Sequence, residues 1–588
     1  MRQFFKFFFA SFLGTMFGLF MVFFFGFLII AAIAAVSGSK GKKEVKPNSV
    51  LHISLDYDIT ERTNKNPFDP MNFSFEGQSN PGLFDIVKSI QYAKTDDKIK
   101  GIYLDVSMVP SGFATVDAVR NALVDFKTSG KFIVSYGEMI SQKGYYLASV
   151  ADEVYMNPVG YMDLTGFRTE LMFFKGALEK LEVEPQIIYC GKYKSATEPF
   201  RLDKMSDENR EQISYIINDI YARFIKNISE SRKLTEAEVD SIADNMLVRD
   251  AEDAVKYKLV DGLLFYDQVI AKLKEKTGTE EKDKLPHVSL DKYIDEEAEE
   301  KKHGKDRIAV LFAEGSIVDG KGEEDNIGSE RFAKAIREIR EDEKVKALVF
   351  RINSGGGSAL ASDVILREIE LTKAKMPIIV SMGDVAASGG YYIACKADTI
   401  VAEPNTITGS IGVFGMLLNM QNFFNNKLGI TFDGVKTGKY SDIGTISRPL
   451  TAEERMIIQA GVDSIYLDFK EHVAKGRGVT VEFVDSIGQG RVWTGVQAKE
   501  RGLVDVLGNL DDAVKIAAEK AGLTDYSLKS YPKQKDPFEM LLENFGAEAE
   551  TFVLKRKLGE QYPVWKKLEE MKTLNGVQAR MPFELEIY

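Results

Sequence analysis

The sequence predicts an α/β fold that is present twice, behind an N-terminal segment that crosses a membrane. Three observations indicate this: short apolar runs alternate with helical patterns, a series of motifs returns at constant spacing, and the start of the chain is almost free of charge. A chain of 588 residues is also too long for one hydrophobic core. About three or four units are therefore expected.

The first unit is a membrane anchor. No charged residue occurs from Phe7 to Val36, and Arg2 and Lys6 precede this run. About 20 apolar residues are enough to cross a bilayer. A cleaved signal peptide is the alternative, and the small residues of Ala31–Ala35 would suit it, but its apolar core has only about 7–15 residues. We therefore predict an uncleaved anchor over residues 1–42, with the body outside the cytoplasm.

The body contains an internal repeat. Ser135–Glu138 returns as Ser381–Asp384, and Gly144–Ala148 returns as Gly390–Ala394, both 246 residues later. Weaker correspondences join Ile99–Leu104 to Val345–Phe350, Gly191–Tyr193 to Gly438–Tyr440, and Leu259–Gly262 to Leu503–Val506. Such self-similarity indicates that one structural unit has been duplicated.

We place the first copy at Asn48–Leu273 and the second at Arg307–Leu523. Strand-like runs such as Ile308–Phe312 and Ala347–Ile352 alternate with helical stretches such as Arg331–Arg340. This alternation predicts a mainly parallel sheet that is covered by helices.

The remaining segments carry no recognisable chemistry. Lys274–Lys305 is rich in lysine and glutamate and is predicted to be a solvated linker, and residues 524–588 form a mixed, charged extension. Asp207–Ser231 and Ala452–Lys475 have helical periodicity, and we expect them to cover the sheets or to mediate assembly.

Composition excludes several classes of protein. The net charge of -12 disfavours nucleic-acid binding, because no basic stripe is available to neutralise phosphates. The only cysteines, Cys190 and Cys395, have no metal-ligand spacing and are expected to be small buried apolar residues. A single disulfide between Cys190 and Cys395 is the alternative. We expect no metal and no cofactor.

Ser388 is the predicted nucleophile. It lies in Asp384–Tyr392, between the strand-like run Pro377–Gly383 and a helical pattern, and small residues flank it. A helix that begins at such a serine directs free backbone N–H groups at developing negative charge. The alternative is an ordinary packing turn between a strand and a helix.

Comparison of the two copies indicates one composite site. At the position of Ser388 the first copy has Gln142, and opposite the glycine-rich turn Asn353–Ser358 it has Ser107–Gly112, which contains a single glycine. Conversely, Lys194 follows the Gly-Lys-Tyr motif of the first copy, whereas the second copy has no lysine after that motif. The serine and the glycine turn come from one copy and the lysine from the other.

A serine hydroxyl needs a base next to it. None of the four histidines, His52, His287, His303 and His472, is close in sequence to a glycine turn or a strand end. Lys194 is the better candidate, provided that burial keeps it neutral. The alternative is a solvated surface lysine. For the oxyanion hole we predict the backbone N–H groups of Gly389 and Gly356.

These motifs resemble those of the signal peptide peptidase A family, also called protease IV, in its long form with two fused repeats. The resemblance runs from the anchor to about Leu523. It depends on Tyr193–Phe200, Asn353–Ser358, Asp384–Tyr392 and Thr408–Gly412. By resemblance, Ser388 is the nucleophile, Lys194 is the general base, and the Ser410 hydroxyl orients the lysine. One departure is Gly355, where the family commonly has proline.

The resemblance implies tandem crotonase-like or Clp-protease-like repeats assembled into a homotetramer on the membrane. It further implies that the substrates are signal peptides left in the bacterial cytoplasmic membrane, and that the sites lie on its extracytoplasmic side. Two rival functions stay open. A crotonase-like enzyme acting on acyl-coenzyme A would bind thioesters, and a catalytically silent membrane scaffold would not react with a serine-directed probe.

Overall fold

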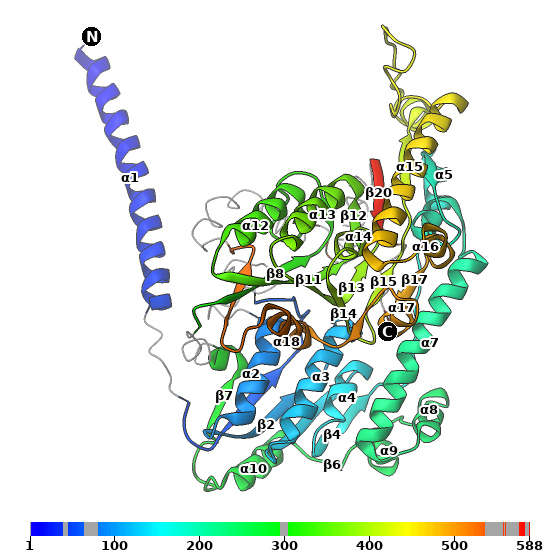
Figure 1. Ribbon diagram of the computed structural model, residues 1–588. Coiled ribbons are helices and arrows are strands. Elements are labelled where there is room, and N and C mark those ends of the chain that lie inside the picture. Colours follow the sequence, from blue (N-terminus) through cyan, green and yellow to red (C-terminus); the bar gives the residue numbers. More distant parts are fainter. Residues whose placement is uncertain are drawn as a thin grey trace.

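A computed structural model describes residues 2–38, 45–63, 80–294, 304–534, 557, 559, 576–581 and 587 of the chain (Figure 1). The N-terminal helix α1 spans Arg2–Gly38 and stands apart from the body. Among the described residues, α1 is the one helix long and apolar enough to cross a membrane, over Gln3–Phe25, and none of that window is buried by the rest of the chain. An exposed apolar surface of this length fits a membrane anchor.

The first copy is built on a parallel sheet. Its strand order is β6-β4-β3-β2-β1-β7, and every neighbouring pair is parallel. The strands are β1 (Ser49–Ser54), β2 (Ile99–Asp105), β3 (Phe132–Ile140), β4 (Glu153–Met162), β6 (Gly262–Leu263) and β7 (His287–Ser289). The helices are α2 (Leu83–Thr95), α3 (Phe113–Lys127), α4 (Gln142–Ala148), α5 (Lys175–Leu181), α6 (Glu198–Arg201), α7 (Asp207–Arg232), α8 (Glu236–Asp244), α9 (Ala251–Lys256) and α10 (Tyr266–Thr277), with the 3-10 turn η1 (Ser195–Thr197).

The second copy repeats this arrangement. Its sheet runs β17-β15-β13-β11-β8-β19, with β14 and β18 branching from β13. The strands are β8 (Arg307–Glu314), β11 (Val345–Ser354), β13 (Ile378–Ala387), β14 (Thr399–Ala402), β15 (Ile407–Gly409), β17 (Val492–Thr494), β18 (Val506–Leu507) and β19 (Ser527–Tyr531). The helices are α12 (Ser329–Glu341), α13 (Ala359–Lys373), α14 (Gly389–Ala394), α15 (Ala452–Arg477), α16 (Val481–Ile487), α17 (Gly495–Glu500) and α18 (Leu510–Ala521), with the π-helical turn η2 (Phe423–Leu428). The predicted duplicated α/β fold is confirmed.

Each copy continues one strand beyond the boundary expected from the sequence. β7 pairs with β1 inside the segment expected to be a linker, and β19 pairs with β8 inside the C-terminal extension. Both are short edge strands with few apolar residues, and their sequences lack the alternation that marks a strand.

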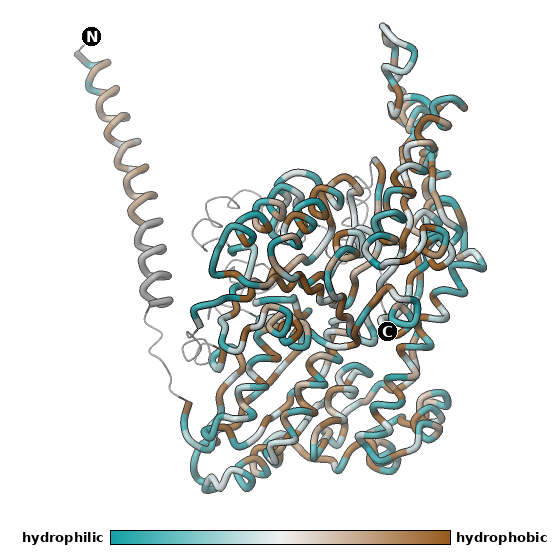
Figure 2. The backbone as a smooth tube through the Cα atoms, in the orientation of Figure 1, coloured by the Kyte–Doolittle hydropathy of each residue, from teal (hydrophilic) through white to brown (hydrophobic). Residues whose placement is uncertain are grey.

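The sheet of the second copy is buried on both faces. Ile308, Val310 and Phe312 of β8 pack with α18, whereas Ala309 and Leu311 belong to the core on the other side. Figure 2 shows this as hydrophobic central strands beneath more hydrophilic helices. Helices on both faces explain why such parallel strands read as nearly continuous apolar runs.

A third sheet joins the copies. Its order is β10-β9-β12-β20-β16-β5, built from β10 (Ile327–Gly328), β9 (Ile317–Val318), β12 (Gly356–Ser358), β20 (Gly576–Arg580), β16 (Phe414–Asn419) and β5 (Glu184–Tyr189). β5 of the first copy pairs antiparallel with β16 of the second. This pairing holds the segment that follows β5, which contains Lys194, against the second copy.

Polar groups are buried between the copies. Glu61 forms an ion pair with Arg351, with 2.7 Å between Oε2 and Nε and both side chains 1% exposed. Asp384 Oδ1 accepts a hydrogen bond of 2.9 Å from the N–H of Thr115. Because buried charges need such partners, these pairs fix one docking of the two copies.

Candidate active site

Ser388 occupies a strained turn between β13 and α14. Its backbone has φ +54° and ψ -113°, and its N–H donates to the carbonyl oxygen of Gly409 at 2.8 Å. A positive φ is uncommon for a residue other than glycine, and it persists only where the surrounding structure imposes it. The turn buries Ser388 completely and points its hydroxyl away from the β13 ladder, toward the first copy.

Lys194 comes from the loop between β5 and η1 of the first copy and is 1% exposed. The loop is held by the second copy, because the N–H of Tyr193 donates to the carbonyl oxygen of Gln489 at 2.9 Å. Gly490 then lies against Lys194 so closely that a Cβ on Gly490 would be 2.6 Å from the lysine Cα. Only glycine fits this contact between the copies.

The structure brings the predicted serine and lysine together. The Nζ of Lys194 lies 2.8 Å from the Oγ of Ser388. It also donates to the carbonyl oxygen of Ser410 at 3.2 Å and lies 3.1 Å from its Oγ. Ser410 has φ +51°, and its N–H donates to the backbone carbonyl oxygen of Arg491 at 2.7 Å. Two serines from the second copy therefore surround one lysine from the first.

Burial lowers the pKa of Lys194 well below its ordinary value. The cause is desolvation, since removal from water penalises the ammonium form and leaves the neutral amine unaffected. A neutral amine accepts a proton, and the atom placed to give it one is the Ser388 hydroxyl.

The two glycines predicted to form an oxyanion hole are adjacent in space. A Cβ on Gly356 would lie 2.6 Å from the backbone nitrogen of Gly389. Gly356 has φ +94°, and its N–H donates to the Oγ of Ser354 at 3.1 Å. The Gly356 N–H is thus already engaged, and Gly357 is the next donor along the loop.

A buried polar network behind Lys194 was not predicted. The Ser195 hydroxyl donates to Asn209 Oδ1 at 2.9 Å, and Gln212 Nε2 donates to the Ser195 Oγ at 2.8 Å. The Gln212 Oε1 accepts from the N–H of Val492 at 3.4 Å. Gln212 therefore ties the lysine loop to the second copy. No sequence pattern marks Gln212, because glutamine on a long helix is ordinary.

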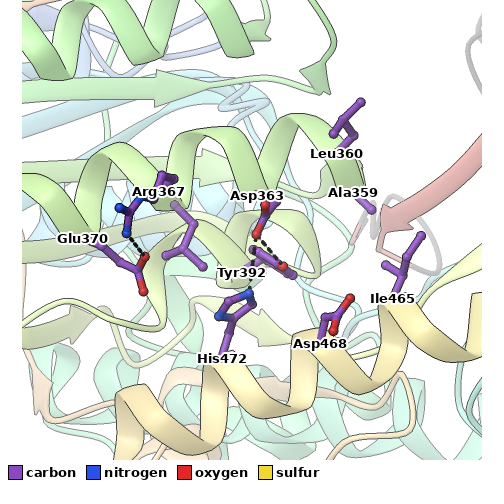
Figure 3. Close-up of a pocket in the computed structure, with 10 residues that line it drawn as sticks. Ala359, Leu360, Asp363, Arg367, Glu370, Tyr392, Ile465, Asp468 and His472 are labelled. Atoms are coloured by element: carbon purple, nitrogen blue, oxygen red, sulfur yellow. Dashed lines mark hydrogen bonds and ion pairs between the residues drawn. The ribbon is translucent and has the colours of Figure 1, made fainter.

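His472 lies on the other side of α14. It lines the pocket shown in Figure 3, where its Nε2 is 3.4 Å from Asp363 Oδ1 and its ring packs edge-on against Tyr392. The pocket is lined by neither Ser388 nor Lys194. The hydroxyl of Ser388 instead contacts Lys194 and the carbonyl oxygen of Gly412. His472 therefore lies in a different pocket from the contact between Ser388 and Lys194.

A buried serine hydroxyl in contact with a buried lysine, at a strained turn between strand and helix, is the arrangement of a serine hydrolase. Comparison with known proteins defines the chain further. It matches peptidase family S49 twice, over residues 125–280 and 370–524, once in each copy. The chain belongs to peptidase family S49 and is a serine peptidase.

Two of its relatives share most of its length, and a third shares less than half of it. It is 34% identical over 549 residues to the chloroplastic serine protease SPPA of Arabidopsis thaliana, covering 92% of this chain and 78% of the relative. It is 38% identical over 471 residues to Protease 4 of Salmonella typhi, covering 79% and 76%. An Enterococcus faecium protein named as a candidate signal peptide peptidase SppA is 35% identical over 251 residues, covering 42% of this chain and 72% of the relative.

A ClpP1 mutant from Listeria monocytogenes matches with a TM-score of 0.24 and 17% identity, covering 35% of this chain and 94% of that chain.

Proposed function

We propose that the chain is a membrane-anchored endopeptidase that uses a Ser388–Lys194 dyad to degrade signal peptides left in the membrane. The observation that carries this proposal is the 2.8 Å contact between the lysine Nζ and the serine Oγ inside a buried site. Membership of a serine peptidase family requires a nucleophilic serine, and Ser388 combines burial, backbone strain and a basic neighbour.

In the proposed mechanism, the neutral amine of Lys194 takes the proton of the Ser388 hydroxyl while the oxygen attacks the peptide carbonyl. The protonated lysine then gives this proton to the leaving amine. Water, activated by the same lysine, releases the acyl group from Ser388. The Ser410 hydroxyl lies 3.1 Å from the Lys194 Nζ and orients this amine toward Ser388.

The tetrahedral intermediate needs donors for its oxyanion. We assign one to the N–H of Gly389, which follows the nucleophile at the start of α14. The second belongs to the glycine loop, where Gly356 is the residue predicted from the sequence and the N–H of Gly357 is the nearest alternative. Gly357 is the stronger choice, because the N–H of Gly356 is bonded to Ser354.

The substrate and the location are supported by the anchor and by a relative. A peptidase held by α1 meets peptides that are themselves in the bilayer, and a bacterial relative carries the name of a signal peptide peptidase. Arg2 and Lys6 precede the apolar run, which favours a cytoplasmic N-terminus and an extracytoplasmic body.

Assembly into a homotetramer is also part of the proposal. Between β16 and α15 the chain forms an arm that projects beyond the body (Figure 1). Leu428, Phe432 and Val435 on this arm are 53%, 52% and 100% exposed. Neighbouring apolar side chains that remain exposed in a monomer are typical of a surface covered by another subunit. The mass of the detergent-solubilised protein tests this directly.

The decisive experiment compares the full-length enzyme in detergent with Ser388→Ala and Lys194→Ala. We expect wild type to cleave an apolar signal-like peptide and to be labelled by a fluorophosphonate, and both variants to lose turnover with unchanged circular dichroism. Wild-type activity in Lys194→Ala would refute the dyad. A folded wild type that neither cleaves nor labels would favour the silent scaffold instead.

A further inference from the structure

A second cavity lies in the first copy, between strands β1 and β2, helix α10 and the loop that leads from α10 to β7. Its volume is about 410 Å³, which is within the range of small-molecule sites. Val50 and Ile270 supply apolar walls, and Tyr266, which is 52% exposed, opens one side to solvent. Neither Ser388 nor Lys194 lines this cavity, so a ligand bound here has a role apart from the candidate active site.

Tyr103 brings a buried hydrogen-bond donor to the cavity. The residue is 4% exposed and lines the cavity, and its hydroxyl has no hydrogen-bond partner among the described residues. Burial, and after it the negative charge of Asp105, raises the pKa of Tyr103, so the hydroxyl keeps its proton. Buried polar groups without a partner are rare, and an oxygen atom of a ligand would satisfy this one.

The ring of Tyr103 is held in place by His52. The two rings stack with 4.9 Å between their centroids and 18° between their planes. The Nε2 of His52 lies 3.4 Å from Asp105 Oδ2, so the imidazole engages the carboxylate that is nearest to this pair. The hydroxyl of Tyr103 is thereby fixed in position before any ligand binds.

The second copy has apolar residues at the same positions. His52 pairs with Tyr103 between β1 and β2, and Val310 pairs with Val349 between β8 and β11. Tyr103 and Val349 are 246 residues apart, which is the spacing of the repeat. Both valines are fully buried in the core beneath α18. Because valine is sufficient for packing here, the polar aromatic pair of the first copy indicates binding.

The charged residues of the lining favour an anion. Lys274, Lys282 and Lys284 line the cavity, and Asp283 adds one carboxylate. Lys282 forms an exposed ion pair with Glu280 at 2.8 Å, whereas the side chain of Lys284 has no partner in the described part of the chain. Lysine ammonium groups and a hydroxyl donor together suit the oxygen atoms of a phosphate group.

The membrane anchor brings one source of phosphate close to the cavity. Twelve residues lead from Gly38, at the end of α1, to Val50 in the cavity wall, and an extended chain of this length spans at most about 40 Å. The connecting sequence is basic, with Lys40, Lys42, Lys43 and Lys46. Basic residues next to a membrane helix attract anionic lipids.

We propose that this cavity binds a phosphate ester, whose phosphate oxygens accept hydrogen bonds from the Tyr103 hydroxyl and the Lys284 ammonium group. The headgroup of an anionic phospholipid is the source that the anchor favours, and a soluble phosphate ester is the other source. The apolar residues Val50 and Ile270 then contact the part of the ligand that carries the phosphate.

The test uses the full-length protein in detergent. Native mass spectrometry counts bound phosphatidylglycerol, and titration calorimetry measures the binding of glycerol 1-phosphate. We expect wild type to bind phosphatidylglycerol at least tenfold more tightly than Tyr103→Phe and Lys284→Gln do. Lys180→Gln, at an exposed lysine of α5, is the matched control and should stay within twofold of wild type. Tyr103→Phe should keep the Tm of wild type without ligand, since its hydroxyl has no partner to lose.

The outcomes distinguish the two sources. Binding of glycerol 1-phosphate that both variants weaken, without selective binding of the lipid, would confirm a phosphate site and refute the phospholipid as its ligand. Phosphatidylglycerol that binds equally to wild type and to both variants belongs to the surface of α1, and this result would refute the cavity as the site. Absence of binding by both probes would refute the proposal altogether.

Discussion

The Nζ of Lys194 lies 2.8 Å from the Oγ of Ser388, although the two residues belong to different copies of the repeat and are 194 positions apart. Neither copy contains both groups, so the site exists only when the copies dock. The pairing of β5 with β16 and the buried ion pair of Glu61 with Arg351 hold that docking in place. Duplication followed by divergence of the two copies explains a site of this kind.

Lys194→Ala should lower kcat by about 10²–10⁴-fold, the usual contribution of a general base. Lys192→Ala is a matched control two residues away, because the Lys192 side chain is 59% exposed, pairs with Glu208 at 3.2 Å and lies over the ring of Tyr193. Its activity should stay within twofold of wild type. Steady-state hydrolysis of one apolar peptide measures both variants, and equal losses would show that the loop as a whole, and not the amine, matters.

The pH dependence of kcat/KM should follow Lys194. Because burial lowers the pKa of this amine, the active neutral form is populated well below the ordinary lysine pKa of about 10.4. Activity is lost as pH falls through the lowered pKa and reaches a plateau above it. A profile between pH 5 and 10 tests this, and activity that still climbs steeply at pH 10 would contradict a buried neutral lysine.

Much of the fold was predictable because the repeat is visible in the sequence. Motifs such as Gly144–Ala148 and Gly390–Ala394 mark the same helix in both copies, as α4 and α14 confirm. The third sheet was not predictable. Strands such as β9 and β12 have two or three residues, and the pairing of β12 with β20 depends on contacts far apart in the chain.

The candidate site was predictable in part for the same reason. Comparing the copies singled out Ser388 and Lys194, and the resemblance added Ser410; the structure brings all three together. Gly490 and Gln212 were missed, since their importance comes from packing between the copies. Nothing in their local sequence distinguishes a glycine that faces a lysine from one in any other turn.

Gly490→Ala should therefore inactivate the enzyme although it replaces neither Ser388 nor Lys194. The new Cβ would lie 2.6 Å from the Cα, Cβ and nitrogen of Lys194, and Gly490 has φ +83°, which alanine rarely adopts. We expect kcat/KM to fall at least 100-fold as the lysine loop is displaced. Gly461→Ala, in α15 with open space around it, should keep full activity and gain about 0.5–1 kcal/mol of stability.

Glu314 offers a test of the interface that is independent of catalysis. Its carboxylate accepts two hydrogen bonds of 3.2 Å from the N–H of Glu61. Burial is the largest cause that raises the pKa of Glu314, and the negative charge of Glu61 raises it further. The folded protein thus holds a proton that the unfolded chain releases near the ordinary glutamate pKa of about 4.3. Stability must fall as pH rises above that value toward the raised pKa.

Glu314→Gln removes this dependence, because the amide is neutral at every pH and keeps an oxygen for the Glu61 N–H. We expect the Tm of wild type to decrease relative to Glu314→Gln between pH 5 and pH 9, with the two proteins closest at the acidic end. Glu323→Gln, on an exposed loop nearby, is the control and should track wild type throughout. A constant difference in Tm across this range would contradict this expectation. It would show that Glu314 is already ionised in the folded protein, so that the interface holds the charged carboxylate of Glu314 beside Glu61.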